Sequence, residues 1–303
     1  MLHEFAVEPR LLCNWKDFRY FVENFGADRG RLIARYPKAW KRMVYDSLVS
    51  CGAVEKKRIE ERLRQIDDRL LVGRTDWDAA VDWLTNAEAE HVARPFHAVL
   101  AVANPRQRSF VLEGESLDDK EPRWALPTSR LVPKTADDLA AAVAPLLRCA
   151  TRVVFIDPYF GPESGSHRRT FEALVQVLGA ATRHRKLERI EFHSGDQAAA
   201  TFFQAECRGR RAKLIPVWIS VRFVRWRKEQ LHNRYILTDC GGILFGHGLD
   251  EQQGSGVDHD DLALLSRDAW RQHWADYVVP SPRLTFVDEI TVVGTKPKPN
   301  TPR

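Results

Sequence analysis

The chain has 303 residues, 44% of them hydrophobic, which is enough to bury a substantial core and to form about two domains. Its longest apolar runs, such as 98–103, are far shorter than the roughly 20 residues that cross a bilayer, so we expect no membrane span. The five cysteines are scattered and never spaced as CxxC, and no HExxH motif or histidine–cysteine cluster occurs, so we expect neither a disulfide framework nor a metal or cofactor. Glu4 and Glu8 interrupt the start of the chain, where a secretory signal would be basic and then apolar, so we expect a cytoplasmic protein.

The formal net charge of +5 is concentrated in one segment. Residues 29–74 hold thirteen Lys and Arg but only six Asp and Glu, a surplus of seven positive charges. Such a surplus suits a nucleic-acid partner, because neutralising phosphates releases counterions. The alternative is a solvated helical surface.

The first 92 residues predict a small helical domain. Residues 14–26 form an amphipathic helix capped by Asn14, and similar patterns span 53–67 and 75–91, with Thr75 as a cap of the second. A further helix is expected over 31–45.

The helix expected at 31–45 carries cations beside aromatic residues. Aromatic rings such as Trp40 and Tyr45 stack on bases while neighbouring cations contact phosphate, although both rings can equally be core residues. The segment's candidate nucleic-acid-binding residues are Arg31, Arg35, Lys38, Lys41 and Arg42.

Residues 96–114 change to a strand-like period around the turn signal NPRQ and predict a β-hairpin. The polar stretch 115–134 then reads as a linker. We therefore expect a basic, mostly helical domain over 1–130 that contains this hairpin.

From residue 131 to 292, helix and strand patterns alternate and predict an α/β domain with a mixed sheet, followed by a flexible tail at 293–303. Strands are expected at 151–160, 189–195, 214–224 and 283–293. Helices are expected at 135–149, from 166 onward, at 196–212 and at 261–278.

A second hairpin is predicted over residues 231–250, LHNRYILTDCGGILFGHGLD. In a regular strand, His232 and Arg234 point to the same side. Asp239 closes the strand, and Gly241 and Gly242 are expected to make the turn.

This hairpin resembles the phospholipase D superfamily, whose signature is histidine, any residue, lysine, four residues, aspartate. His232, Arg234 and Asp239 have that spacing, and 246–250 (GHGLD) stands where the superfamily has a glycine-rich return strand. Together with 156–160 (IDPYF), these stretches look closest to the phospholipase D-like carboxyl-terminal domain of MIT-domain proteins. The resemblance covers about residues 137–290 and implies a mixed sheet flanked by helices.

The resemblance implies that His232 is the nucleophile of a two-step diester cleavage that needs no metal, because a neutral imidazole attacks phosphorus. Arg234 would stabilise charge on the nonbridging oxygens, and Asp239 would orient an imidazole or hold the hairpin. Since the chain holds one motif and the leaving oxygen needs a proton, a homodimer that pairs two copies of His232 is expected.

Other residues are candidates for binding substrate. Asp157 and Tyr159 should emerge at the same end of the sheet as the motif, unless Asp157 only caps a turn. His247 is close to His232 along the hairpin, whereas His193 at a strand end is interpreted as structural. Arg222 lies in a basic stretch before the motif that guides a phosphate backbone or forms an exposed strand edge.

Two departures from the superfamily pattern lead to two functional hypotheses. Arg234 replaces the usual lysine, and Asp250 stands where a neutral amide is common. The leading hypothesis is a metal-independent phosphodiesterase, most simply a nuclease acting on DNA or RNA, alone or within a defence complex. The second is an inactive subunit that binds nucleic acid, a protein partner or an acidic membrane surface. A lipid-cleaving enzyme ranks third, because no interfacial anchor is evident.

Overall fold

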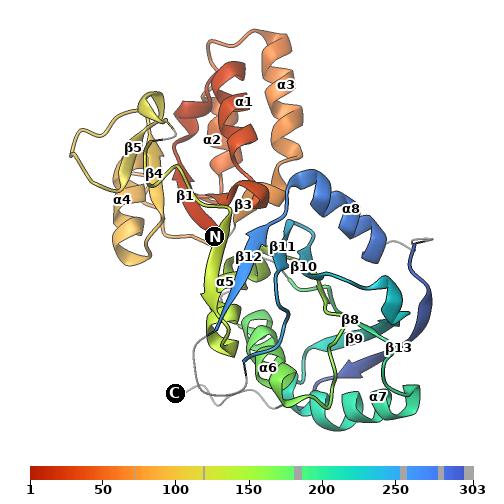
Figure 1. Cartoon of the computed structure of the whole chain (residues 1–303). Helices are drawn as coiled ribbons and strands as arrows, with labels where there is room; N and C mark the ends of the chain where they lie inside the picture. Colours follow the sequence, from red (N-terminus) through yellow and green to blue (C-terminus); the bar gives the residue numbers. More distant parts are fainter. Residues whose placement is uncertain (72, 119, 181–185, 253–257, 279–282, 297–303) are drawn as a thin grey trace. The chain divides into compact units, whose positions relative to one another are not determined.

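The chain folds into two compact α/β units, Met1–Thr128 (the N-terminal unit) and Ser129–Arg303 (the C-terminal unit), in the computed structural model shown in Figure 1. The structure describes all residues except 72, 119, 181–185, 253–257, 279–282 and 297–303. The division falls close to the expected boundary at 130. None of the helices within the described ranges combines the length and apolar composition that a bilayer span requires.

The N-terminal unit is built on a five-stranded parallel sheet in the order β3-β2-β1-β4-β5. β1 lies at the centre, with Phe5 paired to Ile33 on one side and to Ala98 on the other. The strands are β1 (His3–Val7), β2 (Arg31–Ala34), β3 (Leu70–Leu71), β4 (Ala98–Ala101) and β5 (Val111–Glu113).

Helices cover both faces of this sheet, so the N-terminal unit has three layers. On one face, Phe5 and Ile33 pack with Trp40 against the first three helices. On the other face, Ala6 and Val99 pack against the fourth helix. The helices are α1 (Trp15–Asn24), α2 (Trp40–Asp46), α3 (Ala53–Arg64) and α4 (Trp83–Ala93).

The N-terminal unit has more helix than strand, as predicted, but the hairpin predicted at 96–114 is wrong and the sheet was not predicted. Residues 31–34 form a strand, and the helix expected there begins only at Trp40. β4 and β5 run parallel, with Val99 opposite Val111, so they are not a hairpin. The cause is physical: short parallel strands covered on both faces have no apolar–polar alternation, and only alternation distinguishes them from helical segments.

Helix caps were predicted with mixed success. Asn14 caps α1 by accepting a hydrogen bond from the Asp17 amide at 3.0 Å, as expected. Thr75 does not cap α4, because that helix begins later, where Asp82 accepts from the Thr85 amide at 2.9 Å. The prediction failed because Asp82 is itself a good cap seven residues further on.

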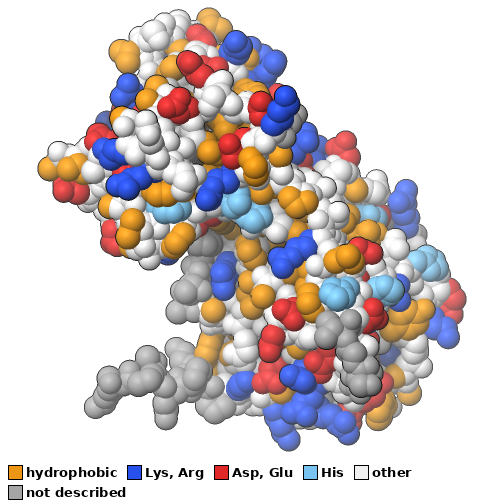
Figure 2. Space-filling view, turned by 60° about the vertical axis from the view of Figure 1, so that its left-hand side comes forward, with side chains coloured by type: hydrophobic (Ala, Val, Ile, Leu, Met, Phe, Trp, Pro, Cys, Tyr) orange, Lys and Arg blue, Asp and Glu red, His pale blue; other side chains and the backbone are white. Residues whose placement is uncertain are grey.

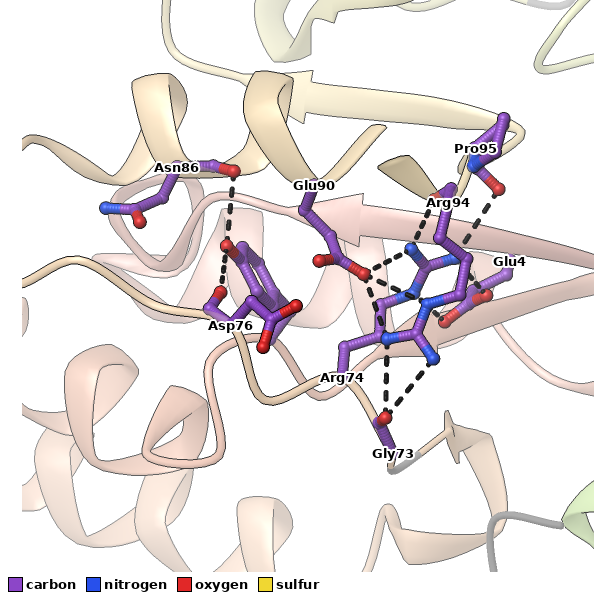
Figure 3. A network of polar contacts seen from close by, with 9 residues as sticks. Glu4, Gly73, Arg74, Asp76, Asn86, Glu90, Arg94 and Pro95 are labelled. Atoms are coloured by element: carbon purple, nitrogen blue, oxygen red, sulfur yellow. Dashed lines mark hydrogen bonds and ion pairs between the residues drawn. The ribbon is translucent and has the colours of Figure 1, made fainter. Parts of the chain in front are cut away.

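A buried ion-pair network joins β1 to α4 in the N-terminal unit (Figure 3). The Arg74 guanidinium, 5% exposed, donates to the two Glu4 oxygens at 2.9 and 2.7 Å and to Glu90 Oε1 at 2.9 Å. Arg94 also donates to Glu90, at 3.0 and 2.9 Å. Each charge of the network is thus paired and hydrogen-bonded, which offsets part of the cost of burying it.

Replacing Arg74 by Met is expected to destabilise the N-terminal unit by about 3–5 kcal/mol, because Glu90 stays buried and loses a charged partner. Hydrogen exchange of peptides spanning β1 measures this. Arg64→Met, which removes only the exposed ion pair between Arg64 and Glu60 at 2.6 Å, is the matched control. Equal exchange rates in the two variants would show that the network is not a stabilising element.

The C-terminal unit contains an eight-stranded mixed sheet in the order β13-β9-β8-β7-β10-β11-β12-β6. β7, β8 and β9 are parallel to each other, and every other neighbouring pair is antiparallel. The strands are β6 (Ser129–Pro133), β7 (Arg152–Ile156), β8 (Arg189–Gly195), β9 (Ser220–Trp226), β10 (Arg234–Thr238), β11 (Gly241–Phe245), β12 (His259–Leu264) and β13 (Phe286–Val293).

Helices also cover the two faces of this second sheet. On one face, Phe192 packs on Phe155 and on Phe171 of α6, with ring centroids 4.3 and 4.8 Å apart. On the opposite face, Tyr235 and Leu237 pack against α8. The helices are α5 (Ala136–Cys149), capped by Thr135 as expected, α6 (Gly165–Gly179), α7 (Ala200–Glu206) and α8 (Arg267–Val278).

The end of the C-terminal unit differs from the prediction in two places. The helix expected at 261–278 is divided into strand β12 and helix α8. Residues 294–296, expected to belong to a flexible tail, hydrogen-bond to the backbone of Ile219, Ala212 and Ile215. The remainder of the expected tail, 297–303, lies outside the described residues.

Candidate functional site

The hairpin predicted at 231–250 is confirmed, with its turn in a different place. β10 and β11 pair from Arg234 opposite Phe245 to Thr238 opposite Gly241. The turn is therefore Asp239–Cys240, and the two glycines expected to form it belong to β11. The Thr238 hydroxyl accepts hydrogen bonds from the Cys240 and Gly241 amides at 3.2 and 3.1 Å, which stabilises a turn without glycine.

Asp239 clamps the hairpin to the start of β7. Its carboxylate accepts hydrogen bonds from the amide and hydroxyl of Thr151, both at 2.8 Å, and from the Arg152 amide at 3.1 Å. Asp239 lies five residues beyond Arg234 along an extended strand, roughly 17 Å away. It therefore holds the hairpin, one of its two expected roles, and lies far from the His232 imidazole.

The opposite end of β10 lies beside the end of β7, where Asp157 is buried. Asp157 accepts hydrogen bonds from the amides of Tyr159 at 2.9 Å and Leu249 at 2.8 Å, and it lies 3.6 Å from His167 Nε2. Burial alone raises the pKa of Asp157, but His167 and the two amides outweigh it, so the pKa is lower than usual. Asp157 is thus an ionised anchor for the loop after β11.

We refer to this end of the sheet, formed by Asp157, His232, Arg234 and residues 246–250, as the site edge. Gly248 lies at its centre with a φ of +135°, a conformation that favours glycine. A Cβ placed there would lie 3.1 Å from Asp157 Oδ2, 3.1 Å from Asp250 Oδ1 and 3.9 Å from Arg234 Nε. Three charged side chains therefore approach one glycine, at a position where a Cβ would be crowded.

Arg234 is the cation of this group. Its guanidinium lies 5.1 Å from the centre of the Tyr159 ring, and its Nη1 donates to the His232 carbonyl at 3.3 Å. Its Nε is buried and has no hydrogen-bond partner among the residues that the structure describes. A buried donor without a partner is costly, so this atom is a preferred position for an acceptor from a ligand.

Asp250 does not face the site edge as a free carboxylate. Lys134 Nζ lies 3.0 Å from Asp250 Oδ1, and the lysine side chain is only 12% exposed. The backbone of Lys134 is fixed by hydrogen bonds to Asp258 and Gln252 at 2.8 and 2.9 Å. Lys134 thus places a cation beside Asp250, which was not predicted from the sequence.

His232 and His247 are both exposed at the site edge. β10 begins at Arg234, so the strand alternation that was expected to place His232 and Arg234 on one face does not include His232. No described residue hydrogen-bonds or ion-pairs with the His232 imidazole. The backbone of His247 donates to the buried Asp260 at 2.9 Å, which fixes the loop and leaves the imidazole exposed.

Arg222 does not belong to the site edge. It lies on β9, three strands from β10 and hence roughly 14 Å away, and donates to Glu191 at 2.8 Å and to Glu289 at 2.8 Å. The expected role of Arg222 in substrate binding is therefore wrong. Its neighbour Arg225 is buried against Asp288.

His193 is structural, as interpreted from the sequence. It is fully enclosed, its Nδ1 accepts a hydrogen bond from Trp226 Nε1 at 3.0 Å, and its Nε2 lies 3.2 Å from Glu191 Oε2. The ring is therefore neutral with the proton on Nε2, and burial lowers its pKa. Burial raises the pKa of Glu191, but His193 and Arg189 more than offset this and lower it to about 2.

In the Glu191→Gln variant, the free energy of unfolding is expected to depend less on pH under acidic conditions. The pKa of Glu191 is about 2 in the folded chain, whereas that of an unperturbed glutamate is 4.5. The stabilisation of the folded chain by ionised Glu191 is therefore complete above pH 4.5 and is lost as the pH falls towards 2. Urea midpoints followed by circular dichroism at pH 5 to 2 measure this. The parent midpoint should fall more steeply than that of the variant, with the exposed Glu229→Gln as control; parallel curves would contradict the assignment.

The five basic residues expected to bind nucleic acid do not form one exposed patch. Arg31 is wrong as a candidate, because it is buried in β2 with its guanidinium 4.1 Å from the Trp124 ring. Lys41 pairs with Asp67 at 2.7 Å. In Figure 2 the N-terminal unit presents Lys and Arg side chains interspersed with Asp and Glu.

The other members of this basic segment are closer to the surface. Arg42 pairs with Asp46 at 3.6 Å, Arg35 donates to the Lys38 carbonyl at 3.0 Å, and Lys38 is exposed. Trp40 is a core residue, as one interpretation had it, whereas Tyr45 is 46% exposed. The charge surplus of 29–74 is therefore partly neutralised by local ion pairs.

Comparison with known proteins gives little guidance. No family model and no curated protein matches the chain. A solved structure of TrmBL2, an archaeal chromatin protein whose structure "shows a novel mode of DNA binding", is similar over 80% of this chain and 88% of that one, with 11% identity and a TM-score of 0.28. A similarity at that level carries no argument about fold or function.

Proposed function

We propose that the site edge binds and cleaves a phosphodiester, most simply in DNA or RNA, with His232 as the nucleophile. The observation that carries this proposal is an exposed imidazole, His232, beside Arg234, a cation whose Nε is buried without a hydrogen-bond partner among the described residues. A phosphate oxygen is negatively charged and accepts hydrogen bonds, so it is a suitable partner for such a donor. The resemblance of His232, Arg234 and Asp239 to the phospholipase D signature supports the same assignment.

The proposed reaction has two steps. The neutral His232 imidazole attacks phosphorus and displaces one ester oxygen, and water then hydrolyses the phosphohistidine. Arg234 stabilises the charge that develops on the nonbridging oxygens. Lys134 offsets the charge of Asp250, so the carboxylate that departs from the superfamily pattern repels the phosphate less than an unpaired one.

His232→Ala is expected to abolish cleavage of labelled single- and double-stranded DNA and RNA in the presence of EDTA, because it removes the proposed nucleophile. His259→Ala, which removes another exposed histidine from β12, is the matched control and should keep parental activity. The proposal fails if the parent cuts none of these substrates, or if His232→Ala cuts them as fast as the control.

A second candidate function is binding of a phosphate backbone without cleavage. Asp157 and Asp250 lie beside Arg234, and two carboxylates so close reduce the positive potential that stabilises a pentacovalent phosphate. This function predicts affinity for labelled oligonucleotides that falls linearly with the logarithm of the salt concentration and weakens in Arg234→Gln. Turnover by the parent would exclude it.

The cleavage function needs a second group that can supply a proton. Cleavage requires that the leaving oxygen be protonated. A homodimer that brings two copies of His232 together supplies such a group, as the resemblance implies. A group within the same chain is the other source.

A further inference from the structure

A small pocket opens beside His232 on the α8 face of the sheet. Its volume is about 190 Å³, roughly six times the ~30 Å³ that a water molecule occupies in the liquid, so it has room for a phosphodiester group. Its polar lining comes from the residues around the start of β10 and from α8 and the chain after it. These residues are His232, Asn233, Tyr235, His273, Asp276 and Arg283.

His273 is held in this pocket by packing against β10. Its ring stacks on Tyr235 with centroids 4.4 Å apart and an interplanar angle of 30°, and the Tyr235 hydroxyl in turn accepts a hydrogen bond from Asn233 Nδ2 at 2.8 Å. Burial lowers the pKa of His273 and Asp276 only partly opposes this, so the imidazolium gives up its proton more readily than that of a free histidine.

The two sides of β10 place different groups around His232. Successive residues of a strand point to opposite faces, so Arg234 and Tyr235 lie on opposite sides of the sheet. Arg234 approaches Gly248 and Tyr159, whereas Tyr235 carries the stacked His273. His232 and His273 thus line one pocket on the α8 face, whereas Arg234 lies on the opposite face of the sheet.

We propose that His273 is the general acid of the reaction, acting in the same chain as His232; this rests on the function proposed above. In the first step, His232 forms a bond to phosphorus, the bond from phosphorus to the leaving oxygen breaks, and the His273 imidazolium gives that oxygen its proton. In the second step, neutral His273 takes a proton from water as the water oxygen attacks phosphorus and the bond to His232 breaks. The sum is one diester and one water converted to a monoester and an alcohol.

The test compares two diesters that differ in their need for an acid. A dinucleotide releases an alkoxide that must be protonated, whereas bis(p-nitrophenyl) phosphate releases a stabilised phenolate. In the full chain under single-turnover conditions, His273→Gln and His273→Ala should lower the rate at which the dinucleotide releases its leaving group by roughly 100-fold or more, the usual contribution of a general acid, and change the rate of nitrophenolate release little. Arg271→Ala, on the exposed side of the same helix, should change neither.

The outcomes separate this inference from the proposed function. Equal losses with both diesters, or no loss, would overturn the role of His273 while leaving the phosphodiesterase intact. If the parent cleaves neither diester, both proposals fail. Thermal unfolding of the Gln and Ala variants confirms that each is folded, and two substitutions of different size guard against a packing defect in one.

A mixing experiment tests whether both histidines act in one chain. His232→Ala and His273→Gln are each expected to be inactive on the dinucleotide. Since both groups belong to the same pocket, a mixture of the two proteins should remain inactive. Restored activity would place the two histidines in different subunits and overturn the proposal of a single-chain pair.

Discussion

The candidate site depends on one constraint, the antiparallel register of β10 against β7. Asp239 fixes this register at one end by accepting three hydrogen bonds from Thr151 and Arg152. At the other end, Asp157 follows β7 directly and ties down the loop after β11 through the Leu249 amide. A slip by one residue would turn Arg234 to the α8 face and Tyr235 away from it, which would dismantle both sides of the site edge.

Carboxylates hold the backbone in place around this register. The buried Asp157 and Asp260 and the half-buried Asp239 each accept hydrogen bonds from backbone amides, which offsets the cost of burying their charges. Their acceptor capacity is therefore engaged by the backbone, and none of them forms an ion pair with Arg234 within the described chain. The guanidinium remains oriented but available, which is the electrostatic state that a phosphate site requires.

The sequence predicted the second unit better than the first, for reasons that can be traced to particular strands. The hairpin 231–250 was predictable because His232, Arg234 and Asp239 carry a recognisable spacing and because the two strands are adjacent in the chain. β1 and β2 were missed because strands of five and four residues that are covered on both faces lack alternation. Arg31 was misjudged for a related reason: a charged residue inside a buried strand is stabilised by Trp124, 93 residues away, which no local pattern reveals.

Parts of the site itself were also beyond prediction. Lys134 follows β6, the edge strand of the sheet. It reaches Asp250 only because β6 pairs with β12. His273 lines the same pocket as His232 only because α8 packs on the face that Tyr235 presents. Both arrangements join residues that are far apart in the sequence, and they depend on the strand order of the folded unit. The sequence thus indicated candidate residues, and the fold showed which groups lie next to them.

The central claim is that His232 forms a covalent bond to phosphorus. The most direct measurement is mass spectrometry of the full chain after brief reaction with an oligonucleotide and an alkaline quench, which preserves a phosphohistidine, followed by peptide mapping. The account predicts a nucleotidyl adduct on the peptide that contains His232 and its loss on acid treatment. Cleavage of the oligonucleotide without an adduct at His232 would contradict it.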